Sequence, residues 1–309
     1  MRIAVVRALQ LGDFLVAVPA LRALRHAYWT AHIALVALPW TRALLERFSR
    51  YIDELVEYPG APADYDLVIQ MHGDGSQSNA VALGLGGKRT AGFYRRGNPC
   101  PDPETFLEWD DRENEVLRCL RLVERVGAPR GTPELEFPLL EDDIAEWSAL
   151  RLSHYVCVHA GSQLPSRRWL PERFAAVADS LAARGDQVVL TGSAGEAALV
   201  QKVERAMRAP ALNLAGKTSI GGLAALVARA RLVLCNDTSI SHIAAAMRTP
   251  SVVVACGSDP NRWAPLDRER HRVLYHDIAC RPCMHAQCPI GHPCALEVKT
   301  ATVLQACAA

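Results

Sequence analysis

The sequence predicts an α/β protein made of two Rossmann-like domains, each with a parallel sheet covered by helices. Short apolar segments alternate with segments whose apolar residues recur at helical spacing, and this series runs for about one domain length twice. The two series are separated by residues 127–138, which are rich in Gly and Pro and read as a linker. Half of the 309 residues are hydrophobic, so each half can bury a core. We therefore expect an N-terminal domain over residues 1–140 and a C-terminal domain over 141–309.

The first series begins with a buried strand at residues 3–6. A helix over residues 13–27 follows, because Leu15, Val18, Leu21 and Leu24 recur at helical spacing. The other elements expected before the linker are strands at 33–36, 66–69 and 90–93 and helices at 40–48, 79–85 and 113–126.

The second series restarts after a charged helix at residues 142–152. Its expected strands are 155–158, 187–190, 212–214, 232–235 and 251–254, and its expected helices are 171–183, 196–207, 220–228 and 243–247. Open α/β sheets bind ligands at the carboxyl ends of their strands. Two such domains joined by a linker are expected to leave a ligand-binding cleft between these ends.

Composition excludes several classes of function. Lys and Arg total 34 and Asp and Glu total 33, a net charge of +1, which gives no support to nucleic-acid binding. No apolar run has the length of a membrane span. The opening segment resembles a signal peptide, but Arg7 and Asp13 interrupt it, so we interpret it as a strand and expect a cytoplasmic protein.

Common nucleotide motifs are missing. Residues 8–13 follow the first strand without a Gly-x-Gly-x-x-Gly pattern, and no Gly-x-x-x-x-Gly-Lys-Ser/Thr occurs, which argues against a dehydrogenase and a P-loop enzyme. The Asp64-x-Asp66 pair has the spacing of a metal-binding motif. Asp66 directly opens a strand, however, so the pair is better explained as a turn followed by a strand start.

Residues 236–242 are the most informative stretch of the chain. They follow an apolar strand and precede a helix of small residues, so Asp237, Thr238 and Ser239 are expected at a helix N-terminus. The first amides of a helix lack intrahelical partners, and the helix dipole favours an anion there. Taken alone, the pattern also fits an ordinary helix capped by Thr238 or Ser239.

Several landmarks in order resemble the bacterial lipopolysaccharide heptosyltransferase family, glycosyltransferase family 9. They are residues 11–21, 66–69, Gly92-Phe93, 159–162, Arg168-Trp169 with Pro171, residues 236–238 with His242, and Pro250, Gly257 and Pro265. The resemblance implies a GT-B architecture, in which two Rossmann-like domains face each other across a cleft. It also implies an inverting glycosyltransferase that moves a heptose or similar sugar from a nucleotide-diphosphate donor, expected to be ADP-linked, to a lipopolysaccharide-core or related glycan acceptor.

The resemblance assigns roles to particular residues. Asp13 becomes the candidate base that takes the acceptor proton, although by itself it also fits an ordinary acidic residue at a helix start. The donor-binding candidates are Ser162, Arg167, Arg168, Asp237, Thr238, Ser239 and His242. The sequence leaves open which of the two arginines faces the donor and whether His242 is a core residue. These groups would support the departing diphosphate without a metal cofactor.

The acceptor candidates are His72, Arg95 and Arg96, on loops of the N-terminal domain. A glycolipid acceptor would also imply peripheral contact with the inner membrane. The chain departs from the family pattern at Ser239, where a Gly is common, and at Gly221 and Gly222, near which an acidic residue often holds the ribose.

Four cysteines lie close together near the C-terminus. Cys280, Cys283, Cys288 and Cys294 have a spacing compatible with a structural zinc or iron site, with reduced buried thiols or disulfides as the alternatives. The other six cysteines sit mostly in apolar runs and are expected in the core.

Two other functions stay open at this point. One is a GT-B epimerase or hydrolase acting on a nucleotide sugar, and the other is a non-catalytic subunit that binds a nucleotide sugar. Product formed without an acceptor would favour the first, and the absence of any binding of ADP- or UDP-sugars would favour an interaction protein.

Overall fold

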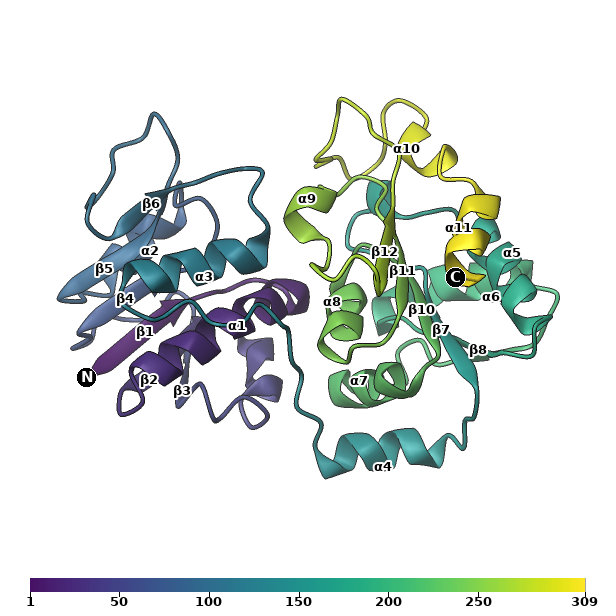
Figure 1. The fold of residues 1–309 in the computed structure, drawn as a ribbon, viewed down its shortest axis with the longest axis horizontal. Helices are drawn as coiled ribbons and strands as arrows, with labels where there is room; N and C mark the ends of the chain where they lie inside the picture. The colour runs from purple at the N-terminus through teal and green to yellow at the C-terminus, as the bar shows by residue number, and fades with distance from the viewer. Residues whose placement is uncertain (309) are drawn as a thin grey trace. The chain divides into compact units, whose positions relative to one another are not determined.

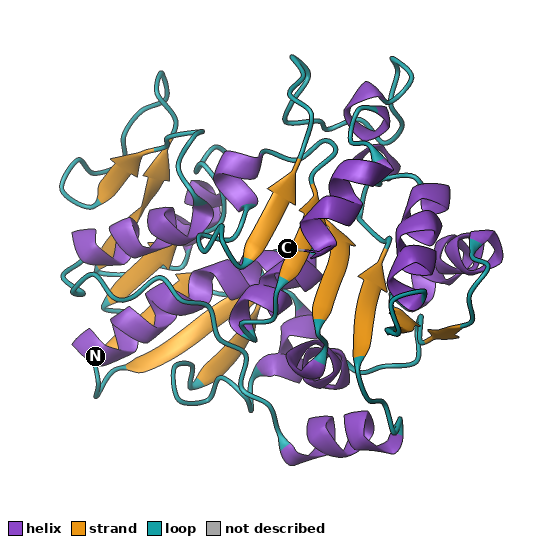
Figure 2. Ribbon diagram, turned by 45° about the vertical axis from the view of Figure 1, so that its right-hand side comes forward, coloured by secondary structure: helices purple, strands orange, loops and turns teal. Residues whose placement is uncertain are grey.

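The computed structural model describes residues 1–308 as two compact units, one spanning Met1–Pro138 and one beginning at Leu139 (Figure 1). Each unit contains a six-stranded parallel sheet, and the strands lie between helices (Figure 2). The α/β prediction is therefore confirmed.

The sheet of the first unit has the order β3-β2-β1-β4-β5-β6. In the central strands, Ile3 of β1 pairs with Ile33 of β2 on one side and with Leu67 of β4 on the other. The strands are β1 (Arg2–Val6), β2 (His32–Ala37), β3 (Glu54–Glu57), β4 (Leu67–Gln70), β5 (Arg89–Tyr94) and β6 (Phe106–Glu108).

Three α-helices flank this sheet, namely α1 (Leu11–Ala27), α2 (Ser78–Gly84) and α3 (Glu115–Arg125). Helices α1 and α3 pack against each other, whereas α2 contacts β4 and β5. The helix predicted at residues 40–48 is wrong in type. The segment Pro39–Leu44 forms a 3-10 helix, η1, in which the amide of Thr41 bonds back only three residues, to the carbonyl of Leu38.

The second unit repeats the same topology, with the order β12-β11-β10-β7-β8-β9. Its strands are β7 (Tyr155–His159), β8 (Gln187–Leu190), β9 (Ala211–Asn213), β10 (Leu232–Asn236), β11 (Ser251–Val254) and β12 (His271–Leu274). Its helices are α4 (Glu141–Ala149), η2 (Pro165–Arg167), α5 (Pro171–Ala182), η3 (Ala194–Glu196), α6 (Ala197–Ala206), α7 (Ile220–Arg229), α8 (Ser239–Ala246), α9 (Pro260–Trp263), α10 (Pro293–Leu296) and α11 (Thr300–Ala308).

The strands β3, β6 and β12 were not anticipated. All three are edge strands whose residues are mostly half-exposed, so they lack the continuous apolar run that marks a central parallel strand.

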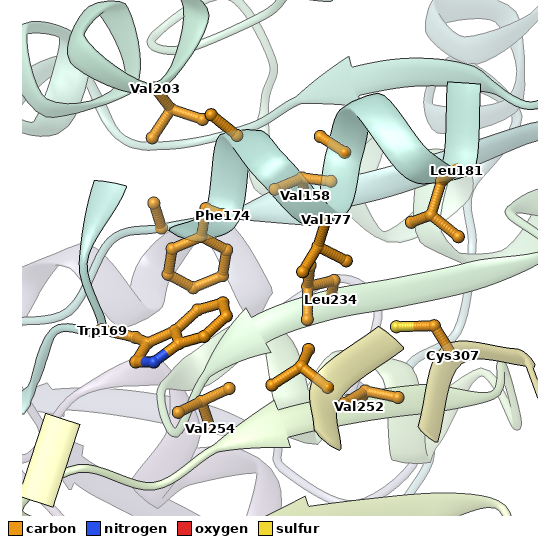
Figure 3. Close-up of a cluster of buried hydrophobic side chains, with 14 of the residues drawn as sticks. Val158, Trp169, Phe174, Val177, Leu181, Val203, Leu234, Val252, Val254 and Cys307 are labelled. Carbon is orange, nitrogen blue, oxygen red and sulfur yellow. The ribbon is translucent and has the colours of Figure 1, made fainter. Parts of the chain in front are cut away.

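The strands β7, β10 and β11 of the second sheet are buried on both faces, as expected for a parallel sheet between helices. Alternate strand residues such as Val158, Leu234 and Val254 join a cluster with side chains of α5, α6 and α11 (Figure 3). Trp169 lies fully buried in this cluster, edge-on to Phe174 with ring centroids 5.1 Å apart. No helix among residues 1–308 is long and apolar enough to cross a membrane.

Candidate functional site

Each sheet has one topological switch point, where neighbouring strands lead to helices on opposite sides. It lies between β1 and β4 in the first unit and between β7 and β10 in the second. Doubly wound sheets bind ligands outside the carboxyl ends of the strands at such points. The loops after these four strands carry most of the residues that the sequence singled out.

In the first unit, Arg7 connects the two switch-point loops. This side chain is only 3% exposed, and its Nε and Nη2 donate to the carbonyl oxygen of Asp13 at 3.0 and 2.8 Å. Its Nη1 donates to the carbonyl of Met71, just after β4, and pairs with Glu115 at 3.1 Å. Arg7 therefore fixes the backbone of both loops, a role that its position directly after β1 did not reveal.

Asp13 is the third residue of α1 and is half-buried. Its Oδ2 accepts a hydrogen bond from the amide of Gln10 at 3.3 Å, as in a capping box. This long bond engages only one carboxylate oxygen, at the start of α1.

His72 follows β4 in the same group of loops. Its Nδ1 accepts a hydrogen bond from the amide of Ala8 at 3.1 Å, and its ring stacks on Tyr58. Burial, assisted by the positive charge of Arg7, lowers the pKa of His72, and Asp13 opposes this only in part. His72 is therefore neutral near pH 7, with its proton on Nε2.

The two predicted acceptor arginines are already paired with carboxylates. Arg95 bonds Asp74 at 2.8 Å and Asp111 at 3.1 Å, so its charge is balanced within the first unit. Arg96 is highly exposed and pairs with Glu108 at 2.7 Å. Both arginines follow β5, which ends at Tyr94. Arg95 reaches Asp74 in the loop after β4, whereas Arg96 is exposed.

In the second unit, Asn236 ties the two switch-point loops together. It is fully buried at the end of β10, and its Oδ1 accepts from the amide of Trp169 at 2.8 Å. Its Nδ2 donates to the carbonyl of Ala160 after β7, also at 2.8 Å. An asparagine directly before Asp237 was visible in the sequence, but its structural role appears only when β7 and β10 lie side by side.

Helix α8 begins at Ser239, directly after Thr238. Thr238 occupies the N-cap position with an extended backbone, yet its side chain makes no capping hydrogen bond. Its carbonyl accepts from both the amide and the hydroxyl of Ser241, at 2.9 and 2.7 Å. The Thr238 hydroxyl is thus not used to cap α8.

His242 lies one turn into α8 and is only 4% exposed. Its ring packs edge-on to Trp263, with centroids 6.4 Å apart. This burial places His242 against α9.

The structure distinguishes the two adjacent arginines. Arg168 donates from Nε to the carbonyl of Ser162 at 2.8 Å, so it stays beside the loop after β7. Arg167 donates from Nε and Nη2 to the carbonyl of Cys283, at 3.2 and 2.8 Å. Arg168 is therefore the arginine of the Ser162 loop, and Arg167 anchors the cysteine-rich segment.

Gly222, near the start of α7, has a structural explanation. A Cβ on Gly222 would lie 2.1 Å from the carboxylate of Glu146, which comes from α4. Both oxygens of that carboxylate are used, because they accept from the amide and the hydroxyl of Ser219 at 2.9 and 2.6 Å. Glu146 thus caps α7 from a neighbouring helix.

The cysteine-rich segment does not assemble the metal site considered above. All ten cysteines are free thiols, and within residues 1–308 no three His, Cys, Asp or Glu side chains are arranged to hold a metal ion. Cys283 is buried with its Sγ 3.6 Å from the Ser166 hydroxyl, and the Sγ of Cys288 accepts from the amide of His292 at 3.1 Å. Cys294 is packed in the core of the second unit, whereas Cys280 is exposed. The thiols are thus directed to different partners, so the four do not fit a shared ion as they stand.

Comparisons with known proteins agree with this architecture. The chain is 36% identical over 115 residues to lipopolysaccharide heptosyltransferase 3 of Escherichia coli K12, a match that spans 36% of this chain and only 33% of that protein. Among solved structures, E. coli ADP-heptose lps heptosyltransferase II is similar with a TM-score of 0.77 at 22% identity, over 100% of this chain and 98% of that chain. E. coli heptosyltransferase WaaC, solved with ADP, has a TM-score of 0.66 at 18% identity, over 88% of this chain and 92% of that chain. These similarities confirm the GT-B fold. The family model described as glycosyltransferase family 9 (heptosyltransferase) matches residues 62–293, well over half of the sequence, and the chain therefore belongs to this family.

Proposed function

We propose that this protein is an inverting glycosyltransferase that moves a heptose or similar sugar from an ADP-linked donor to a lipopolysaccharide-core or related glycan acceptor. Family membership supports the reaction class. The similar structure of E. coli heptosyltransferase WaaC, solved with ADP, supports an ADP-linked donor. The observation that carries the proposal is the start of α8, where Thr238 lies at the β7/β10 switch point with a hydroxyl that makes no capping bond. A helix N-terminus of this kind suits the diphosphate of a nucleotide sugar.

The leaving diphosphate needs electrostatic support as the glycosidic bond breaks. Thr238 and Ser239 supply hydroxyls at the positive end of α8, and Ser162 with Arg168 lies on the neighbouring loop. Cations and dipoles aimed at developing charge stabilise the transition state, so these groups would act without a metal. Arg167 is removed from this set, because its guanidinium is bound to the Cys283 carbonyl.

Asp237 has a different task from that of its neighbours. An ionised carboxylate only accepts hydrogen bonds, so it repels phosphate oxygens and attracts hydroxyl donors. We assign Asp237 to the hydroxyls of the transferred sugar. His242, buried against Trp263, would support this loop from behind.

Asp13 is the proposed base. Its half-buried carboxylate lies at the β1/β4 switch point, and Arg7 holds its backbone in place. It would take the proton of the acceptor hydroxyl while that oxygen attacks the anomeric carbon and the nucleoside diphosphate departs. A single displacement inverts the anomeric centre, through a transition state with the oxocarbenium character known from glycosidases.

The acceptor would lie on the loops of the first unit. Neutral His72 offers an Nε2–H donor rather than a positive charge, whereas Arg95 and Arg96 offer guanidinium groups at or near the ends of β4 and β5. A glycolipid acceptor would bring the protein to the cytoplasmic face of the inner membrane.

Turnover with ADP-heptose and a core acceptor tests the proposal. The Asp13→Asn variant should transfer sugar about 10²- to 10⁴-fold more slowly while ADP binding is retained, since it loses the base and not the donor site. Asp142→Asn, an exposed carboxylate on α4, is the matched control and should be fully active. Undiminished transfer by Asp13→Asn would remove the assigned base. Sugar release without an acceptor would favour a hydrolase or epimerase instead.

A further inference from the structure

Residues 281–286, which we call the anchor loop, contain neither helix nor strand and contact two other loops of the second unit. One is residues 162–168, which follow β7, and the other is residues 255–259, which follow β11. Because β10 lies between β7 and β11 in the sheet, these two loops flank the start of α8, where Thr238 lies. The anchor loop therefore contacts both sides of the proposed diphosphate site.

The anchor loop is fastened to the carboxyl end of β11 by its backbone and by Arg281. The Arg281 guanidinium and the Cys283 amide donate to four consecutive carbonyl oxygens, those of Ala255, Cys256, Gly257 and Ser258. Nη2 of Arg281 makes two of these bonds, at 3.0 and 2.9 Å, and the Cys283 amide makes the bond to Gly257, at 2.7 Å. One arginine thus fixes the anchor loop to a strand end of the sheet.

The three loops converge at Gly257. A Cβ built on this glycine would stand 2.8 Å from the Cβ of Cys283 and 3.4 Å from the Cγ of Arg167. The absence of a side chain at position 257 is what lets the anchor loop and the loop after β7 approach the loop after β11 this closely.

Ser166 fastens the loop after β7 to the same anchor loop. This residue is only 2% exposed, its hydroxyl donates to the carbonyl of His285 at 2.5 Å, and its amide donates to that of Ala286 at 3.3 Å. The next residue, Arg167, donates from Nε and Nη2 to the carbonyl of Cys283. The anchor loop therefore holds the middle of residues 162–168.

This attachment matters for the donor because residues 162–168 carry Ser162 and Arg168. Arg168 donates to the Ser162 carbonyl at 2.8 Å, and the regular structure in this loop is the short η2. A ligand that binds to a loose loop must offset the entropy lost on ordering it, whereas a loop held in advance binds at no such cost. The anchor loop supplies this order before the donor arrives.

The contacts of Ser166 and Arg281 act in series. The Ser166 hydroxyl ties the loop after β7 to the anchor loop, and Arg281 ties the anchor loop to the end of β11. Releasing either contact frees residues 162–168 from the sheet along this path, so releasing the second as well adds little.

We propose that Ser166 and Arg281 are positioning residues, which act through the anchor loop to hold Ser162 and Arg168 ready for the diphosphate of the donor. The inference rests on the proposed function, because it requires a nucleoside diphosphate at the start of α8.

A double-mutant cycle, measured by calorimetry with ADP on the full chain, tests the series arrangement. Ser166→Ala and Arg281→Gln should each weaken ADP binding by about tenfold, as expected when one ordering contact is lost. The double variant should bind only slightly more weakly than either single variant, whereas independent contacts would give a loss of about a hundredfold. If Arg281→Gln does not fold, Arg281→Lys, which keeps the charge but loses the forked geometry, replaces it in the cycle.

Kinetics separate positioning from a loss of folded protein. A loosened donor loop should raise KM for ADP-heptose in each single variant and leave KM for the acceptor unchanged. Partial unfolding would instead lower kcat alone, because fewer molecules are active. A lowered kcat with an unaltered donor KM would therefore contradict the proposal.

The controls are Ser180→Ala on α5 and Arg205→Gln on α6, which should bind ADP like the unaltered protein. Normal ADP binding by both folded single variants overturns the proposal, as does a fully additive loss in the double variant. If the unaltered protein binds no ADP at all, the proposed function fails first, and this outcome is distinct from a failure of the anchor loop alone.

Discussion

The cluster of buried charges next to Asp13 gives the most direct test of what stabilises the first unit. Glu115, 1% exposed, lies between two arginines that are themselves buried, Arg7 at 3% and Arg118 at 0%. Its Oε1 pairs with Arg7 at 3.1 Å, and its Oε2 pairs with Arg118. Glu115→Gln keeps the shape of the side chain and removes its negative charge.

The expected cost follows from this geometry. Removing one partner of a buried ion pair typically destabilises a protein by about 3–5 kcal/mol, because the remaining charge is left buried and uncompensated. Here two guanidinium groups lose their shared carboxylate, whereas the glutamine still offers one oxygen as an acceptor. We expect about 3 kcal/mol, which corresponds to faster amide exchange by roughly a hundredfold in the first unit.

Hydrogen exchange followed by mass spectrometry suits this protein, because it reports on each unit separately. Peptides from α1 and α3 should exchange faster in Glu115→Gln, whereas peptides from β7 and β10 should not change. Glu124→Gln changes an exposed carboxylate on the same helix and should match the unaltered protein. Exchange in α1 that stays within a fewfold of normal would refute the reasoning that Glu115 compensates both arginines.

Further predictions concern the second unit. Gly161→Ala should weaken ADP binding in calorimetry, because its Cβ would stand 2.1 Å from a carboxylate oxygen of Glu196 and force the loop after β7 to shift; binding equal to that of the unaltered protein would contradict this. Burial lowers the pKa of His271 to about 4, so between pH 6.5 and 4 the unfolded chain takes up a proton that the folded chain excludes. Stability should therefore fall by up to about 3 kcal/mol as the pH drops through this window, and urea titrations of His271→Asn should show a correspondingly flatter dependence. Arg168→Ala should slow sugar transfer by about 10²- to 10³-fold, whereas Arg167→Ala should mainly expose Cys283 to thiol reagents; equal effects of both variants on transfer would contradict the roles assigned here.

Several features could be predicted because they depend on local sequence. The central strands β1, β4, β7 and β10 are continuous apolar runs, and such runs are typical of strands buried on both faces. The start of α8 was visible because a strand, a polar turn and a small-residue helix follow one another directly. Half-exposed edge strands such as β6 carry no such pattern and were missed.

The sequence by itself determined the α/β class, the repeated strand–helix series and the residues available for chemistry at the strand ends. Only the tertiary structure decided which of those residues meet. Arg7 joins loops 64 residues apart, and Asn236 bonds Ala160 from 76 residues away. The tertiary structure also decided that Arg167 donates a hydrogen bond to Cys283, whereas Arg168 donates one to Ser162. The physical reason is that hydrophobic periodicity fixes which face of an element is buried, whereas hydrogen bonds between loops depend on the strand order, which no local pattern encodes.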